Sequence, residues 1–68
     1  MKILIQDGCS KRYLSATGEW VDEAREGESF VSHRQACEVA RHTLAEEFSI
    51  ILYSALGGYA FSIDQGRK

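Results

Sequence analysis

Residues 31–64 read VSHRQACEVARHTLAEEFSIILYSALGGYAFSID, and this stretch decides the fold. It opens with a capping box, in which the Ser32 side chain accepts a hydrogen bond from the Gln35 amide and the Gln35 side chain returns to the Ser32 amide. Apolar residues follow at a spacing of three to four, the period of an amphipathic helix. They are Ala36, Cys37, Ala40, Leu44 and Phe48. The pattern predicts a helix that begins after Ser32 and packs one face on a sheet.

A glycine-turned hairpin is predicted after this helix. Residues 49–54 are rich in β-branched and aromatic side chains, residues 55–58 turn the chain, and residues 59–64 alternate between apolar and polar positions. Alternation assigns two sets of side chains to opposite faces of a strand. The core face receives Tyr59, Phe61 and Ile63, and the other face receives Ala60, Ser62 and Asp64. We expect the two strands to pair antiparallel and residues 65–68 to form a frayed basic end.

The first half of the chain predicts two or three further strands. The strand segments are residues 2–6, 11–15 and 19–21, with a turn at residues 7–8 and an acidic loop over residues 22–29. The expected fold is therefore α+β, with a single helix packed on an antiparallel sheet of four to five strands in the order β-β(-β)-α-β-β. All 68 residues belong to a single small domain.

Composition indicates a folded protein. Hydrophobic residues make up 44% of the chain and charged residues 26%, whereas disordered chains combine few apolar residues with high net charge. The few apolar residues after Met1 are too short a run for a signal peptide or a membrane span, so we expect a cytoplasmic protein with no membrane partner. Cys9 and Cys37 are expected to be reduced thiols, with a single bridge as the alternative in an oxidising compartment.

The strand over residues 49–54 is apolar on both faces. Ile50 and Leu52 point one way, and Ile51 and Tyr53 point the other way, which is the pattern of a strand covered twice. A single helix covers one face only. The second face is covered either by an N-terminal hairpin, whose Leu4 would join Ile51 and Tyr53, or by a second copy of the chain. These three residues form the candidate interface, with a homodimer or an unidentified protein as the partner.

His33 and Cys37 are the candidate metal or catalytic pair. Their separation by four places both on one face of the helix, where two soft ligands could meet. Two ligands do not make a site, because His42 lies on the far side of the helix and the other thiol, Cys9, is remote in sequence. No third group is evident that would orient His33 as a base for Cys37. We therefore expect no catalytic residue, no metal and no cofactor, and hence no enzyme.

Single-stranded nucleic-acid binding is the alternative function. A sheet carrying Tyr13, Tyr53 and Tyr59 beside Lys11 and Arg12 is similar in kind to the stacking platforms that bind single strands. The electrostatics oppose this interpretation. The net charge is −2, and residues 19–28 carry five acidic side chains that would repel phosphates. Nucleic acid is thus the less favoured partner.

Two short motifs carry a resemblance. The run Gly18-Glu19-Trp20-Val21 and the pattern Phe30-x-Ser32 before a helix with Ala36 and Ala40 resemble small bacterial and phage-borne proteins of unknown function. In those proteins a Gly-x-Trp element precedes a helix start of this type and a terminal hairpin. The resemblance implies an α+β fold and no activity. We predict a non-enzymatic protein-interaction module, homodimeric through an apolar sheet face or bound to another protein.

Overall fold

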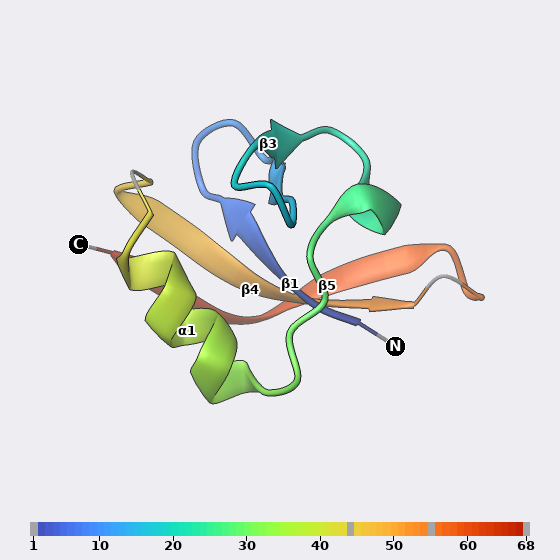
Figure 1. The fold of residues 1–68 in the computed structure, drawn as a ribbon. Coiled ribbons are helices and arrows are strands. Elements are labelled where there is room, and N and C mark those ends of the chain that lie inside the picture. Colours follow the sequence, from blue (N-terminus) through green and yellow to red (C-terminus); the bar gives the residue numbers. More distant parts are fainter. Residues whose placement is uncertain (1, 44, 55, 68) are drawn as a thin grey trace.

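One helix lies across a five-stranded antiparallel sheet, which confirms the predicted α+β fold (Figure 1). The structure is a computed structural model that describes residues 2–43, 45–54 and 56–67. Its elements are β1 (Lys2–Asp7), β2 (Tyr13–Leu14), β3 (Trp20–Val21), the 3-10 turn η1 (Ala24–Glu26), α1 (His33–Arg41), β4 (Glu47–Ser54) and β5 (Tyr59–Arg67). Leu44 of the predicted helical stripe, Ala55 of the predicted turn and Lys68 of the predicted tail lie outside the described residues.

The sheet has the strand order β3-β2-β1-β4-β5, so the longest strands lie at its centre and at one edge. In the β1–β4 pair, Ile5 lies opposite Ile50 and Leu4 lies opposite Ile51. Residues that are opposite each other share a face of the sheet, so one face carries Ile5 and Ile50 toward α1. The core under the helix consists of Ile5, Leu14, Ala36, Ala40, Phe48 and Ile50.

The helix begins as predicted and ends earlier than the apolar stripe suggested. The Gln35 amide donates to Ser32 Oγ at 3.1 Å, but the Gln35 side chain accepts from the Val31 amide at 2.9 Å and not from Ser32. The helix ends at Arg41, so Phe48 is not a helical residue. Phe48 lies in β4 and reaches the same core from the sheet. Position 48 is apolar because its side chain belongs to the core, and this holds whether a helix or a strand carries the residue.

β5 is longer than predicted and contains an irregularity. Residues 65–67, expected to fray, pair with β4, where Gly66 lies opposite Phe48. The register shifts between Ile50 and Ile51, which lie opposite Asp64 and Ser62, so Ile63 is the extra residue of a β-bulge. A one-residue shift moves the following side chains to the opposite face. Asp64 therefore shares the helix face with Ile50, and the predicted placement away from the core is wrong.

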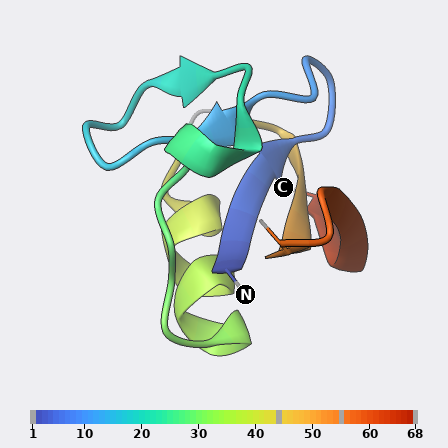
Figure 2. The same ribbon diagram turned by 90° about the vertical axis from the view of Figure 1, so that its right-hand side faces the viewer.

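The helix packs on β1 and β4 and leaves β5 at the edge of the sheet. In the view of Figure 2, α1 and much of β5 project to opposite sides of β1, although Asp64 of β5 reaches His33 of α1. Phe61 and Ile63, which alternation assigned to the core face, are 47% and 44% exposed for this reason. The apolar alternation of β5 therefore does not correspond to burial.

The second face of the sheet is covered by the chain itself. After η1, the Glu28 amide donates to the Leu14 carbonyl at 2.8 Å and the Phe30 amide to the Ile3 carbonyl at 2.9 Å. The first bond holds the segment against β2, and the second holds it against the edge of β1. Gly27 is buried there, where an added Cβ would lie 3.4 Å from Leu4 Cδ2. The predicted alternatives were an N-terminal hairpin, whose Leu4 would join Ile51, or a second copy. Leu4 does lie opposite Ile51, on β1, and the segment around Gly27 covers Leu4.

Candidate functional site

The three predicted interface residues lie on the face of the sheet away from α1, but they differ in exposure. Leu4 is fully buried and Ile51 is 4% exposed within a single chain. Tyr53 is half-buried. Since two of the three side chains are already covered, this face offers a partner little apolar surface.

The predicted stacking tyrosines are not brought together. Tyr13 lies opposite Gln6, whereas Tyr53 lies opposite Lys2, four positions away along β1. At about 3.3 Å per residue this separation is about 13 Å along the strand, before the lateral spacing of the strands is added. The Tyr59 side chain lies outside what the structure describes. Tyr13 and Tyr53 therefore do not form a continuous platform on which neighbouring bases could stack.

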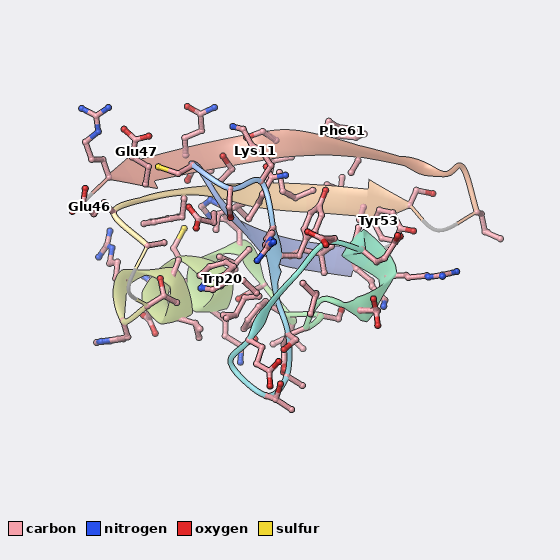
Figure 3. The ribbon with its side chains drawn as sticks, turned by 90° about the horizontal axis from the view of Figure 1, so that it is seen from above. Lys11, Trp20, Glu46, Glu47, Tyr53 and Phe61 are labelled. Atoms are coloured by element: carbon pink, nitrogen blue, oxygen red, sulfur yellow. The ribbon has the colours of Figure 1, made fainter. Side chains whose placement is uncertain are left out.

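The largest exposed apolar side chains of the sheet lie on β5. Phe61 and Ile63 are about half exposed, and Leu56 in the preceding turn is fully exposed. In Figure 3, β5 forms the outer rim of the molecule and Phe61 projects from it, on the side away from Trp20. The opposite edge strand, β3, has only two residues. Exposed apolar side chains and a long edge strand thus coincide on β5.

A second feature joins α1 to β5. His33 and Cys37 are neighbours on the helix, and the cysteine sulfur lies 3.7 Å from His33 Nε2. The same imidazole nitrogen donates to Asp64 Oδ2 at 2.6 Å, and the sulfur lies 4.0 Å from that oxygen. Imidazole, thiol and carboxylate therefore converge on one point between the helix and the edge strand.

The pKa values of Asp64 and Cys37 in this cluster are shifted in opposite directions. The hydrogen bond from His33, followed by that from the Gln65 amide, lowers the pKa of Asp64 below its ordinary value. Burial, followed by the nearby Asp64 carboxylate, raises the pKa of the Cys37 thiol, while Arg41 opposes the shift. The free Cys37 is thus a neutral thiol at pH 7, which is unfavourable for a nucleophile.

The cluster also differs from a catalytic triad in its connectivity. In a triad the nucleophile and the carboxylate bind different nitrogens of the histidine, so that one nitrogen accepts the proton of the nucleophile while the carboxylate orients the ring from the other nitrogen. Here both the sulfur and the carboxylate lie at Nε2 of His33. Three potential ligand atoms therefore lie around a common point, and the imidazole is not placed between the thiol and the carboxylate as it is in a triad.

Sequence reasoning identified two of the three members. The i,i+4 spacing of His33 and Cys37 predicted their shared face, whereas Asp64 was assigned to the opposite side of the sheet. No local signal in residues 59–64 reveals the bulge at Ile63, because it is visible only in the pairing with β4. The third member was therefore missed.

A shallow hollow of about 340 Å³ opens beside the ends of β4 and β5. It is lined by Gly8, Lys11, Glu47, Phe48, Ser49, Gln65, Gly66 and Arg67. Arg67 donates to Glu47, so two of the charges around the hollow neutralise each other. The mixed lining does not select one class of ligand.

Comparisons with protein-family models, with curated proteins and with solved structures found no match to this chain. The resemblance to small bacterial and phage-borne proteins therefore stays a prediction. In the described part of the chain, no helix has the length and apolar character needed to cross a membrane. Cys9 and Cys37 are both free thiols.

Proposed function

We propose that this protein is a non-enzymatic interaction module that associates with a second copy of itself by pairing their β5 strands. The observation that carries the proposal is the half-exposed pair Phe61 and Ile63 on a nine-residue strand at the end of the sheet. We place the protein in the cytoplasm, where its two thiols remain reduced.

The edge of the sheet supports this choice of surface. An outer strand presents backbone N–H and C=O groups that can pair with another strand, and proteins usually protect such edges by keeping them short or charged. β3 is short, with two residues. β5 has nine residues, and its charged side chains, Asp64 and Arg67, lie in its second half. The exposed apolar half of β5 is therefore the less protected edge.

A second copy is a suitable occupant because the strand complements itself. A twofold axis makes two β5 strands antiparallel, and the same patch then serves both copies. With Ile63 on the axis, Asp64 lies opposite Ser62 of the second copy and Arg67 opposite Tyr59, so no like charges face each other. A register centred on Phe61 also avoids like charges. The bulge interrupts the strand once, so we expect weak pairing, with a Kd on the order of micromolar.

Sedimentation equilibrium over a wide range of protein concentration tests the proposal. We expect the wild type to dimerise and the Ile63→Lys variant to stay monomeric, because a lysine on the edge disfavours pairing. Val31→Lys is the matched control, since Val31 is 87% exposed and lies before α1, outside β5. It should dimerise as the wild type does.

Three outcomes would overturn the proposal. The wild type could remain monomeric at the highest concentration, or Ile63→Lys could dimerise unchanged. The third is a monomer that gains the mass of a mixed single-stranded oligonucleotide at low salt, which would favour the nucleic-acid alternative.

A further inference from the structure

We propose that His33, Cys37 and Asp64 form a binding site for a divalent transition-metal ion of the Zn²⁺ class. This proposal does not depend on the proposed dimer. It rests on contacts among His33, Cys37 and Asp64 within one chain, whereas the dimer rests on the exposure of Phe61 and Ile63. Two of the ligands come from α1 and the third from β5, so neither element alone contains the whole site.

Three potential ligand atoms from two elements converge on one point. A pair of side chains at i and i+4 on a helix presents two ligand atoms to the same point, as metal-binding helices do. The third ligand arrives from a strand 31 residues after His33. The three ligand atoms lie within 4.8 Å of one another, and Cys37 is half-buried between two exposed side chains.

The distances between the three ligand atoms are close to those around a bound zinc ion. Around a tetrahedral Zn²⁺ ion with ordinary bond lengths, sulfur lies about 3.6 Å from nitrogen or oxygen, and nitrogen lies about 3.4 Å from oxygen. The observed separations from Cys37 Sγ are 3.7 Å to His33 Nε2 and 4.0 Å to Asp64 Oδ2. His33 and Asp64 are hydrogen-bonded at 2.6 Å and must move apart by under an ångström. Both side chains are about half exposed, which permits this movement.

The donor atoms of the cluster favour one class of metal ion. A thiolate and an imidazole favour zinc, cobalt and similar ions, whereas Mg²⁺ and Ca²⁺ prefer a shell of oxygens. Binding would displace the thiol proton of Cys37 and the shared proton between His33 and Asp64. Three protein ligands leave a fourth position open for water or for a group from another molecule.

The bound ion would cross-link the helix to the edge strand. An ion that binds only the folded state stabilises it by mass action, so metal should raise the melting temperature. The simpler alternative is a solvent-exposed hydrogen bond between His33 and Asp64, to which the sulfur of Cys37 contributes nothing. The two interpretations differ in whether Cys37 is needed.

Titration of the reduced protein with Co²⁺ tests the site, because a thiolate bound to cobalt gives a charge-transfer absorption. We expect one ion per chain, displacement of Co²⁺ by Zn²⁺, and loss of the absorption in Cys37→Ser. His33→Ala and Asp64→Asn should each weaken binding at least tenfold. Cys9→Ser and His42→Ala are the matched controls and should bind as the wild type does. Circular dichroism of each variant establishes that it is folded.

Specific outcomes would overturn the proposal. Absorption that persists in Cys37→Ser and disappears in Cys9→Ser would place the metal elsewhere. Wild-type affinity in a folded Asp64→Asn variant would mean that the strand supplies no ligand. A wild type that gives no charge-transfer absorption at millimolar Co²⁺ would also refute the site.

Discussion

The substitution Gly66→Ala tests the end of β5, which the sequence predicts to be frayed and the structure pairs with β4. A Cβ at position 66 would lie 2.7 and 2.9 Å from Cε1 and Cε2 of Phe48. Such overpacking costs about 1–3 kcal/mol, because the ring must leave its rotamer or the strand must shift. Alanine is better than glycine in a strand by about 0.5–1 kcal/mol. Subtracting this gain from the overpacking cost leaves a net loss of unfolding free energy of about 0–2.5 kcal/mol, with about 1 kcal/mol near its centre.

Urea denaturation measures this loss, with fluorescence of the half-buried Trp20 as the signal. Each kcal/mol should also lower the Tm by about 4–8 °C in a domain of this size. Gln65→Ala is the neighbouring control and should change stability by about 0.5 kcal/mol or less, since Gln65 is exposed.

A double-mutant cycle with Phe48→Leu locates the cause of the effect. If the Phe48 ring meets the new methyl group, the smaller leucine should remove most of the Gly66→Ala penalty, with a coupling of about 1 kcal/mol or more. A Gly66→Ala variant about 0.5–1 kcal/mol more stable than the wild type would refute the reasoning, because only the alanine gain would then be seen and residues 65–67 would not pack on Phe48. A penalty that stays the same in the Phe48→Leu background would refute the contact alone.

Three other measurements test the core, the helix cap and the cysteines. Ile50→Ala should destabilise the protein by about 2–5 kcal/mol because Ile50 is fully buried, whereas Ile63→Ala, at 44% exposure, should cost under about 1 kcal/mol in unfolding experiments on the monomer. Ser32→Ala should cost about 1 kcal/mol through loss of the hydrogen bond from the Gln35 amide, and similar stability of the variant would argue against the cap. At neutral pH without metal, Cys37 should react with iodoacetamide more slowly than the exposed Cys9, because burial raises the Cys37 pKa and lowers its thiolate fraction. Faster labelling of Cys37 would favour a catalytic role.

Local interactions explain what could be predicted. The helix start depends on Ser32 and Gln35, which are three residues apart, and the structure places the serine bond as expected. The paired strands β4 and β5 follow from apolar runs on either side of a glycine turn. The two missed details of the helix have different causes. The Gln35 side chain could accept a hydrogen bond from either of two neighbouring amides, and it accepts from that of Val31. Phe48 is apolar because it belongs to the core, but it reaches the core from a strand and not from the helix.

The sequence by itself determined the fold class, the start of the helix and the pairing of His33 with Cys37, because each depends on residues close together in the chain. Only the tertiary structure decided the coverage of Leu4, the exposure of β5 and the position of Asp64. The coverage depends on contacts between β1 and the segment around Gly27, far apart in sequence. Asp64 reached the helix face through a bulge in its pairing with β4. A one-residue change in register reverses the face of a strand, and no pattern within the strand records it.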